Sequence, residues 1–222
     1  MKFTRNRRLL AALTALLLLL AALPLSAAGA ASYGTLRYGS RGAEVRELQG
    51  NLIMLGYLTD RADGVFGYNT RSAVLRYQQR NGLSPDGVAG SVTRTAIAKE
   101  VLRILKVVDT AKSFLGLPYR YGGTSPSTGF DCSGLTQYAY EKAGVSIPRV
   151  SYEQAAAGKS VPRAQLRVGD LLAFNSPVSH VGIYVGGGKF IHSPKTGDVV
   201  KLTNLTAMNL TAIRRFTGAL VY

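Results

Sequence analysis

The sequence contains little cysteine, little histidine and few acidic residues. Its 222 residues include one cysteine and two histidines, and 12 Asp and Glu stand against 27 Lys and Arg, which gives a formal net charge of +15. A single cysteine cannot form a disulfide within the chain, so Cys132 is an intermolecular bridge, a buried apolar side chain or a reactive thiol. The excess of positive charge indicates either attraction to polyanions or an ordinary solvated surface. No nucleic-acid recognition motif accompanies it, so we expect no nucleic-acid partner.

Only one long apolar stretch is present, and it lies at the N-terminus. Four basic residues precede an apolar run from Leu9 to Leu23, which Pro24 ends before a series of small residues. This pattern predicts an export signal over residues 1–30, cleaved after Ala28-Gly29-Ala30 or after Ser26-Ala27-Ala28. The run is short for a membrane span, which favours cleavage over an uncleaved anchor. We therefore expect a secreted protein with no stable membrane span after cleavage and a remaining net charge of +11. The polyanions nearest to it would be teichoic acids, other anionic wall polymers or lipid head groups.

Residues 36–98 contain an internal repeat. The segments Asp63 to Thr70 and Asp86 to Thr93 share the pattern D-G-V-x-G-x-x-T at a spacing of 23 residues. Each places glycine for a tight turn before a polar residue that can cap a helix, and apolar residues around each segment recur at helical spacing. The sequence thus predicts a small all-α domain built from a repeated helical unit.

This region resembles the peptidoglycan-binding domain that accompanies many wall hydrolases. The resemblance rests on the two repeats together with Gly39 to Gly42, Leu48-Gln49, Leu55-Gly56, Tyr77-Gln78 and Gly82-Leu83. It implies binding to the wall polymer. Some relatives hold a metal through histidine, but this segment contains none, so no metal is expected. After it we expect a short turn near residues 97–102 and then a helix that runs to Gly116.

The last third of the sequence has the pattern of β-strands. Short apolar runs occur over residues 170–174, 180–185 and 189–192, and further strands are expected over Val199 to Leu202 and Ala219 to Tyr222. Gly186 to Gly188 between two of these runs indicates a hairpin. Because helical patterns precede the strands, the C-terminal half is expected to be α+β, with helices packed on an antiparallel sheet.

The surroundings of Cys132 favour a reactive thiol. A glycine-rich loop precedes it, and Leu135, Tyr138 and Ala139 follow at helical spacing. Cys132 is therefore expected in the first turn of a helix, with Asp131 or Ser133 near the cap. Unpaired backbone N–H groups and the positive end of the helix dipole are expected there to lower the thiol pKa.

The two histidines fall on the two expected strands of the hairpin. If the turn is centred on Gly186, His180 lies directly opposite His192; if it is centred on Gly187, the two are diagonal neighbours on the same face. In either register one imidazole can accept the thiol proton while the other orients it. The alternative is that two unrelated histidines happen to lie in strands.

Residues 104–222 resemble the NlpC-type cell-wall cysteine peptidases. Six motifs occur in order: Pro118 to Gly123, Phe130 to Leu135, Ile147 to Gln154, Gly169 to Leu172, His180 to Tyr184 and Phe190 to Ser193. The resemblance implies a papain-like core and cleavage of peptidoglycan stem peptides, commonly between γ-D-Glu and diaminopimelate or lysine. No metal or other cofactor is implied.

Residue by residue, the resemblance makes Cys132 the nucleophile, His180 the general base and His192 the third residue that orients it. It gives Tyr119 a role at the oxyanion, and it places Asp131, Ser133 and Ser151 against the stem peptide. Three functions stay open at this point. They are a stem-peptide endopeptidase attached to a wall-binding module, an amidase or acyltransferase of the same superfamily, and a catalytically silent wall-binding protein.

Overall fold

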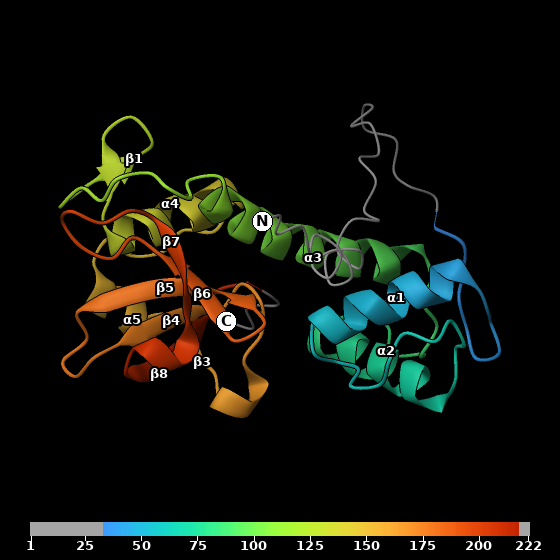
Figure 1. The fold of residues 1–222 in the computed structure, drawn as a ribbon. Coiled ribbons are helices and arrows are strands. Elements are labelled where there is room, and N and C mark those ends of the chain that lie inside the picture. Colours follow the sequence, from blue (N-terminus) through green and yellow to red (C-terminus); the bar gives the residue numbers. More distant parts are fainter. Residues whose placement is uncertain (1–32, 218–222) are drawn as a thin grey trace, which may run out of the picture. The chain divides into compact units, whose positions relative to one another are not determined.

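The computed structural model describes residues 33–217 (Figure 1). The predicted export signal over residues 1–30 and the strand expected at Ala219 to Tyr222 lie outside these residues. Within the described range, none of the helices combines the length and apolar character that a membrane crossing requires. The described residues comprise the two regions that the sequence patterns separate, residues 36–98 and the segment that follows.

Three helices form the N-terminal region: α1 (Ala43–Met54), α2 (Tyr68–Arg80) and α3 (Ser91–Lys112). Their apolar faces meet in one core, in which Leu52, Phe66 and Tyr77 are almost fully buried. The predicted all-α character of this region is confirmed, and the two D-G-V segments form the connections that lead into α2 and α3.

A buried glutamine explains why the D-G-V-x-G-x-x-T pattern recurs. The Gln49 side-chain nitrogen lies 2.8 Å from Asp63 Oδ1, 3.0 Å from the Val65 carbonyl and 3.0 Å from Thr70 Oγ1, while its oxygen accepts the Gly64 N–H at 2.8 Å. In the second repeat Gln78 makes the corresponding four bonds, which are to Asp86, Val88, Thr93 and Gly87. Each loop is thus folded around one amide that satisfies its otherwise unpaired polar groups.

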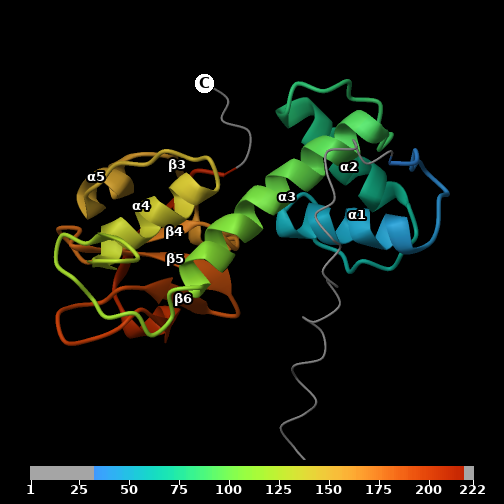
Figure 2. The same cartoon turned by 90° about the horizontal axis from the view of Figure 1, so that it is seen from above.

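Helix α3 passes without interruption through residues 97–102, so the turn expected there is wrong (Figure 2). That stretch contains neither glycine nor proline, and its Ala, Lys, Glu and Leu residues favour helix. Ile97, Val101 and Ile104 on α3 pack in the N-terminal core, whereas Val107 and Ala111 pack in the C-terminal one. The helix ends at Lys112, short of the expected Gly116.

The C-terminal region places two helices against a six-stranded antiparallel sheet. The helices are α4 (Cys132–Lys142) and α5 (Ser151–Ala156). The sheet order is β3-β8-β4-β5-β6-β7, with strands Lys159–Ser160, Leu210–Arg215, Leu171–Phe174, His180–Gly186, Lys189–His192 and Lys201–Asn204. A two-stranded hairpin, β1 (Thr124–Ser125) and β2 (Gly129–Phe130), precedes α4, and 3₁₀ turns lie at Arg163–Gln165 and Leu205–Ala207. The predicted α+β class is confirmed.

Successive side chains along a strand point to opposite faces of the sheet, so the strands contribute to two hydrophobic cores. Ile183 and Ile191 pack with α4 and α5, while Phe174 and Phe190 pack in a second cluster with Leu205. Two strand expectations need correction. The strand expected over Val199 to Leu202 lies at Lys201–Asn204, and strand β8, which pairs with β4 in the middle of the sheet, was not expected.

Candidate active site

The two histidines face each other across neighbouring strands of the sheet. Strand β5 pairs with β6 through Ile183 opposite Ile191 and Tyr184 opposite Phe190. Of the two expected registers, the one centred on Gly187 is therefore the register found. It makes His180 and His192 diagonal neighbours, and His180 Nε2 lies 2.7 Å from His192 Nδ1 with the rings nearly perpendicular at 85°.

Gly182 allows the strands to approach closely between the histidines. A Cβ at this position would lie 2.7 Å from Phe190 Cδ2, 2.8 Å from the Ile191 carbonyl oxygen and 3.3 Å from His192 Cβ. Any larger residue would therefore push against the strand that carries His192. Phe174 and Phe190 pack on the imidazoles at ring-centroid distances of 6.1 Å from His180 and 4.7 Å from His192. The imidazole pair is thus held between aromatic rings and a glycine.

Cys132 is the first residue of α4, as the sequence predicted. Asp131 caps the helix, its Oδ1 accepting the Gly134 N–H at 2.6 Å. The backbone N–H of Val181, the residue that follows His180, lies near enough to the sulfur to lower the pKa of the thiol, against the larger effect of burial. The structure therefore brings the one thiol to the start of the strand that carries the first histidine.

Close backbone contacts fix the loop before α4. A Cβ on Gly134 would lie 2.0 Å from the Gly123 carbonyl oxygen, and a Cβ on Gly123 would lie 2.3 Å from the Gly129 carbonyl oxygen. These glycines let the loop lie directly on the first turn of the helix. Ser193 Oγ donates to the Phe130 carbonyl at 2.7 Å, which ties the end of β6 to the residue two before the thiol. The positions of Cys132 and His192 are thus coupled through the backbone.

Burial controls protonation in this site, and the expected lowering of the thiol pKa is wrong. Desolvation raises the pKa of Cys132, and the negative charge of Asp131 raises it further, while backbone N–H groups of Val181 and Ser133 act in the opposite direction. Burial lowers the pKa of His180 to about 4; burial, then the charge of His180, lower that of His192 to about 3. At neutral pH the resting site therefore contains a neutral thiol and two neutral imidazoles.

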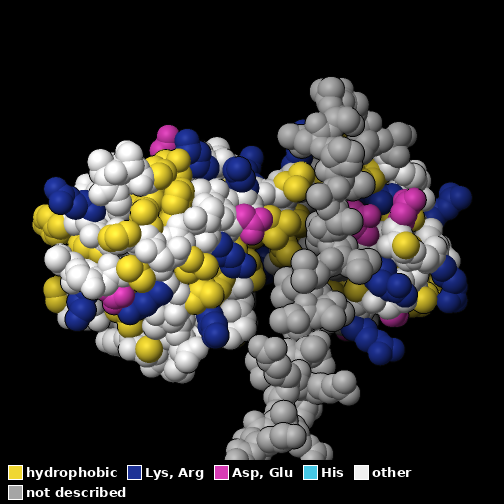
Figure 3. Space-filling model, turned by 45° about the horizontal axis from the view of Figure 1, so that its top comes forward, with side chains coloured by type: hydrophobic (Ala, Val, Ile, Leu, Met, Phe, Trp, Pro, Cys, Tyr) yellow, Lys and Arg dark blue, Asp and Glu magenta, His cyan; other side chains and the backbone are white. Residues whose placement is uncertain are grey.

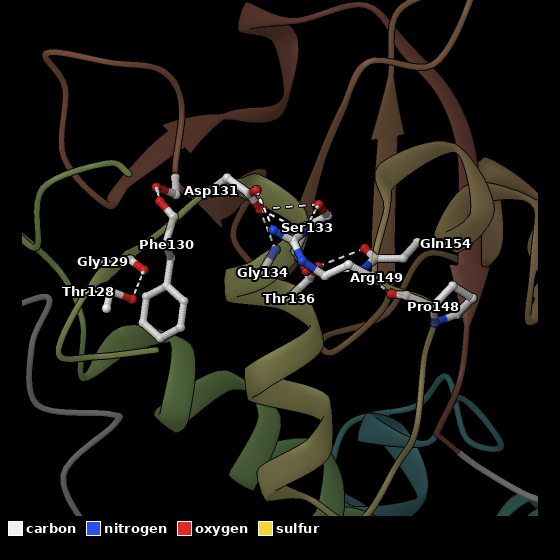
Figure 4. Close-up of polar contacts among 11 residues, drawn as sticks. Thr128, Gly129, Phe130, Asp131, Ser133, Gly134, Thr136, Pro148, Arg149 and Gln154 are labelled. Atoms are coloured by element: carbon white, nitrogen blue, oxygen red, sulfur yellow. Dashed lines mark hydrogen bonds and ion pairs between the residues drawn. The ribbon is translucent and has the colours of Figure 1, made fainter. Parts of the chain in front are cut away.

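Arg149 organises the polar side of the helix start (Figure 4). Its two terminal nitrogens lie 3.1 and 2.6 Å from the two carboxylate oxygens of Asp131, and one of them lies 2.8 Å from Ser133 Oγ. Gln154, fully buried on α5, donates to the Ser133 carbonyl at 3.0 Å and accepts from Thr136 Oγ1 at 2.7 Å. The segment from Arg149 to Gln154 is therefore attached to the first turn of α4.

Of the other expected site residues, Tyr119 lies beside the thiol and Ser151 at the edge of this arrangement. Burial raises the pKa of the Tyr119 hydroxyl, and its neighbours Cys132 and Asp131 raise it further. The backbone of Tyr119 is fixed by donation of its N–H to the Asp198 carbonyl at 2.9 Å. Ser151 is the half-buried first residue of α5.

Sequence reasoning missed four residues that shape the site: Arg149, Gln154, Gly182 and Thr203. The first three fall within the quoted motifs, but no role was assigned to them. Thr203, whose Oγ1 lies 2.8 Å from His192 Nε2, falls in none of these motifs and becomes visible only through strand pairing. Within residues 33–217, no three His, Cys, Asp or Glu side chains gather as metal ligands would.

A thiol at the start of a helix, next to a histidine pair on an antiparallel sheet, defines a papain-like α+β architecture. Profile comparison agrees: the NlpC/P60 family profile matches residues 116–215, and a profile described as a putative peptidoglycan binding domain matches residues 41–97. The chain therefore contains an NlpC/P60 domain over residues 116–215 and an N-terminal domain of the second type over residues 41–97.

Named relatives match a part of the chain that amounts to about half of its length or less. The gamma-D-glutamyl-L-lysine dipeptidyl-peptidase of Bacillus subtilis is 46% identical over 118 residues, covering 49% of this chain and 40% of that protein. The murein DD-endopeptidase MepH of Escherichia coli is 46% identical over 99 residues, covering 41% of this chain and 36% of that protein. The chain therefore spans less than half the length of either relative.

A solved structure shows the same fold. The peptidoglycan hydrolase RipB from Mycobacterium tuberculosis superposes with a TM-score of 0.52 at 28% identity, covering 68% of this chain and 82% of that chain.

Proposed function

We propose that the chain is a peptidoglycan endopeptidase in which Cys132 is the nucleophile, His180 the general base and His192 the residue that orients it. One observation carries the proposal: Cys132 begins α4 with the Val181 backbone N–H near its thiol, and Nε2 of the adjacent His180 lies 2.7 Å from His192 Nδ1. A half-buried thiol next to an oriented imidazole is the arrangement that nucleophilic acyl transfer requires.

The protonation states define how the thiol is activated. Because the resting thiol and imidazole are both neutral, His180 takes the proton as the sulfur attacks the substrate carbonyl. The Nε2 atom of His180 is engaged by His192, so its Nδ1 atom accepts this proton. The imidazolium then protonates the leaving amine, and water assisted by His180 releases the acyl group from the sulfur.

The negative charge on the tetrahedral intermediate needs hydrogen-bond donors close to the sulfur. The backbone N–H of Cys132 belongs to the first turn of α4, where backbone donors lack partners within the helix. Burial raises the pKa of the Tyr119 hydroxyl and the nearby charges of Cys132 and Asp131 raise it further, which supports a place for this hydroxyl near the sulfur. We assign these two groups as the oxyanion donors.

The polar groups around the start of α4 suit a charged peptide. Asp131, Ser133 and Ser151 are proposed to contact the stem peptide. Arg149 compensates the carboxylate of Asp131 and offers positive charge beside the thiol, because its side chain keeps about a third of its surface exposed. A γ-D-glutamyl residue carries a free α-carboxylate, which suits such a site. We therefore propose cleavage between γ-D-Glu and diaminopimelate or lysine.

Residues 36–98 are proposed to bind the wall polymer, and residues 104–222 to carry the chemistry. The first proposal is supported by the match to a putative peptidoglycan binding domain. Lys and Arg side chains are spread over the face drawn in Figure 3 rather than gathered in one patch. Such a distribution suits general attraction to an anionic wall. We propose that the protein is secreted and associated with the cell wall.

A different bond is the second candidate, because one relative is named a murein DD-endopeptidase and another a gamma-D-glutamyl-L-lysine dipeptidyl-peptidase. Digestion of defined muropeptides followed by mass spectrometry distinguishes the two, since the fragment masses identify the bond cut. Fragments that separate the glycan from the whole stem would instead indicate an amidase.

The role of the thiol is tested by substitution. Cys132→Ala should abolish cleavage of soluble muropeptides and leave sedimentation with purified wall unchanged. Cleavage at the wild-type rate by Cys132→Ala would exclude the assigned nucleophile. A wild-type chain that sediments with wall but cuts no muropeptide would instead be a silent binding protein. Deletion of residues 33–90, which removes α1, α2 and both loops but keeps α3, should weaken sedimentation and spare muropeptide cleavage.

A further inference from the structure

Both ring nitrogens of His192 are engaged, and the second partner is Thr203. His192 Nδ1 lies 2.7 Å from His180 Nε2, and His192 Nε2 lies 2.8 Å from Thr203 Oγ1. Thr203 is on β7 opposite Phe190 of β6, while His192 is opposite Lys201. His192 and Thr203 are therefore diagonal neighbours on one face of the sheet. A line of hydrogen bonds crosses β5, β6 and β7 and ends at this hydroxyl.

The direction of these hydrogen bonds follows from the task of His180. A general base needs a lone pair on the nitrogen that meets the thiol, and this is Nδ1 because Nε2 contacts His192. A neutral imidazole carries one N–H, so His180 must carry it on Nε2 and donate it to His192 Nδ1. His192 must then carry its own N–H on Nε2. That hydrogen needs an acceptor, and Thr203 Oγ1 lies in its place.

The opposite arrangement would disable the base. If His192 carried its hydrogen on Nδ1, it would donate to His180 Nε2, and His180 would present an N–H to the thiol instead of a lone pair. Both arrangements contain two neutral rings, so they differ only in tautomer. The partner of His192 Nε2 therefore influences whether His180 can accept a proton.

The carboxylate near His192 is already paired with other groups, so Thr203 is the acceptor for the His192 Nε2–H group. Asp198 Oδ2 is paired with Lys201 Nζ at 2.5 Å, and Asp198 Oδ1 accepts the Val199 N–H at 2.8 Å. This carboxylate and this ammonium thus neutralise each other beside the ring.

We propose that Thr203 is a positioning residue that holds His192 in its Nε2–H tautomer and thereby keeps His180 able to accept the thiol proton. The inference rests on the proposed cysteine-peptidase function. Thr203 itself touches neither substrate nor sulfur in this role. Valine has the same β-branched shape and fits a strand equally well, so Thr203→Val removes the hydroxyl with little change in packing.

The kinetic test compares Thr203→Val with two controls. Thr203→Val should lower kcat/KM on a soluble muropeptide about tenfold, mainly through kcat, which is the size expected when a part-buried N–H loses its acceptor. Thr203→Ser keeps the hydroxyl and should restore most of the activity. Thr211→Val on β8, which removes a hydroxyl that donates to the Ala173 carbonyl of β4, should leave kcat/KM unchanged.

The tautomer itself is read by nitrogen NMR of the imidazole rings. All samples carry Cys132→Ala, so that a muropeptide added to them is not digested. His192 should show the Nε2–H form with Thr203 present and a mixture of forms in Thr203→Val. An unchanged tautomer in Thr203→Val overturns the proposal, even if the activity falls, because the role would then be structural. The NMR measurement does not require the protein to be an active peptidase. It can therefore test the role of Thr203 even if the proposed peptidase function is wrong. Should Thr203→Val not fold, the Thr203→Ser spectrum and kinetics still have to match the wild type.

Discussion

The geometry of the histidine pair should depend on the absence of a side chain at position 182. In Gly182→Ala the new Cβ would meet Phe190 Cδ2 at 2.7 Å and the Ile191 carbonyl oxygen at 2.8 Å. Carbon atoms in contact normally stay about 3.5–4.0 Å apart, so the Phe190 ring has to move by roughly 0.8 Å. The Ile191 oxygen belongs to the backbone and cannot rotate away. Strand β6 itself must shift, and His192 moves with it.

Two magnitudes follow from this displacement. Inserting one methyl group into a well-packed site typically costs about 1–3 kcal/mol, which for a chain of this size lowers the melting temperature by roughly 2–12 °C. The hydrogen bond between His180 and His192 is 2.7 Å long, and a shift of roughly half an ångström takes it to the weak end of the normal range. Because misplacement of about 1 Å can reduce a rate 100-fold, we expect kcat/KM to fall about 10- to 100-fold.

The assay pairs Gly182→Ala with Gly50→Ala. Gly50 is exposed on α1, and no atom lies within 4 Å of the place that a Cβ would occupy, so alanine there should stabilise the helix by about 0.5–1 kcal/mol and leave kcat/KM unchanged. Both variants are compared with the wild type by thermal unfolding and by muropeptide cleavage well below the melting temperature. If Gly182→Ala keeps the wild-type melting temperature and kcat/KM, close approach of β5 and β6 does not set the histidine geometry.

Three further predictions concern the loops, the backbone tie and pH. Gln78→Leu should destabilise the N-terminal domain by about 2–3 kcal/mol in urea unfolding, since it leaves the buried Gly87 N–H without an acceptor, whereas the exposed Gln79→Leu should change little. Ser193→Ala should cost about 1–1.5 kcal/mol of stability and lower kcat/KM, because it frees β6 from the loop before α4; unchanged values of both would contradict this coupling. The free energy of unfolding should fall as pH decreases from about 6.5 to about 4, because the histidines, with pKa values of about 4 and about 3 in the fold, take up protons only on unfolding. Urea titrations across this range should show a shallower slope for His192→Gln than for the wild type.

Local patterns in the sequence were enough to predict the elements that carry the site. The glycines between residues 180 and 192 marked a hairpin, and the loop before Cys132 marked the start of a helix. The sequence allows two registers for the hairpin because either tight turn fits three consecutive glycines. Strand β8 was missed because its pattern, Leu210 to Arg215, includes two arginines, one of which is bonded to the buried Asp170.

Long-range contacts account for what the sequence did not reveal. Arg149 and Thr203 lie 17 and 71 residues from Cys132 along the chain, and only the packing of α5 and β7 brings each to its partner. The contacts of Gln49 and Gln78 are also not visible in the sequence pattern. The D-G-V segments can be recognised in the sequence, but the amide at the centre of each loop comes from the preceding helix. A motif shows that a turn exists, whereas the group that satisfies its polar atoms is chosen by the fold.

The thiol pKa shows how burial outweighs a local rule. A helix N-terminus stabilises a negative charge by about 0.3–1 kcal/mol when it is exposed, and here Asp131 already occupies one of the free N–H groups at 2.6 Å. Desolvation of Cys132 and the carboxylate beside it act against this stabilisation and raise the pKa. The same burial lowers the pKa of His180 and keeps its ring neutral. A site of this kind is protected from premature ionisation, and its proton transfer has to be arranged by geometry. The tautomer of the histidine pair, rather than a preformed charge on sulfur, then decides whether the thiol can react.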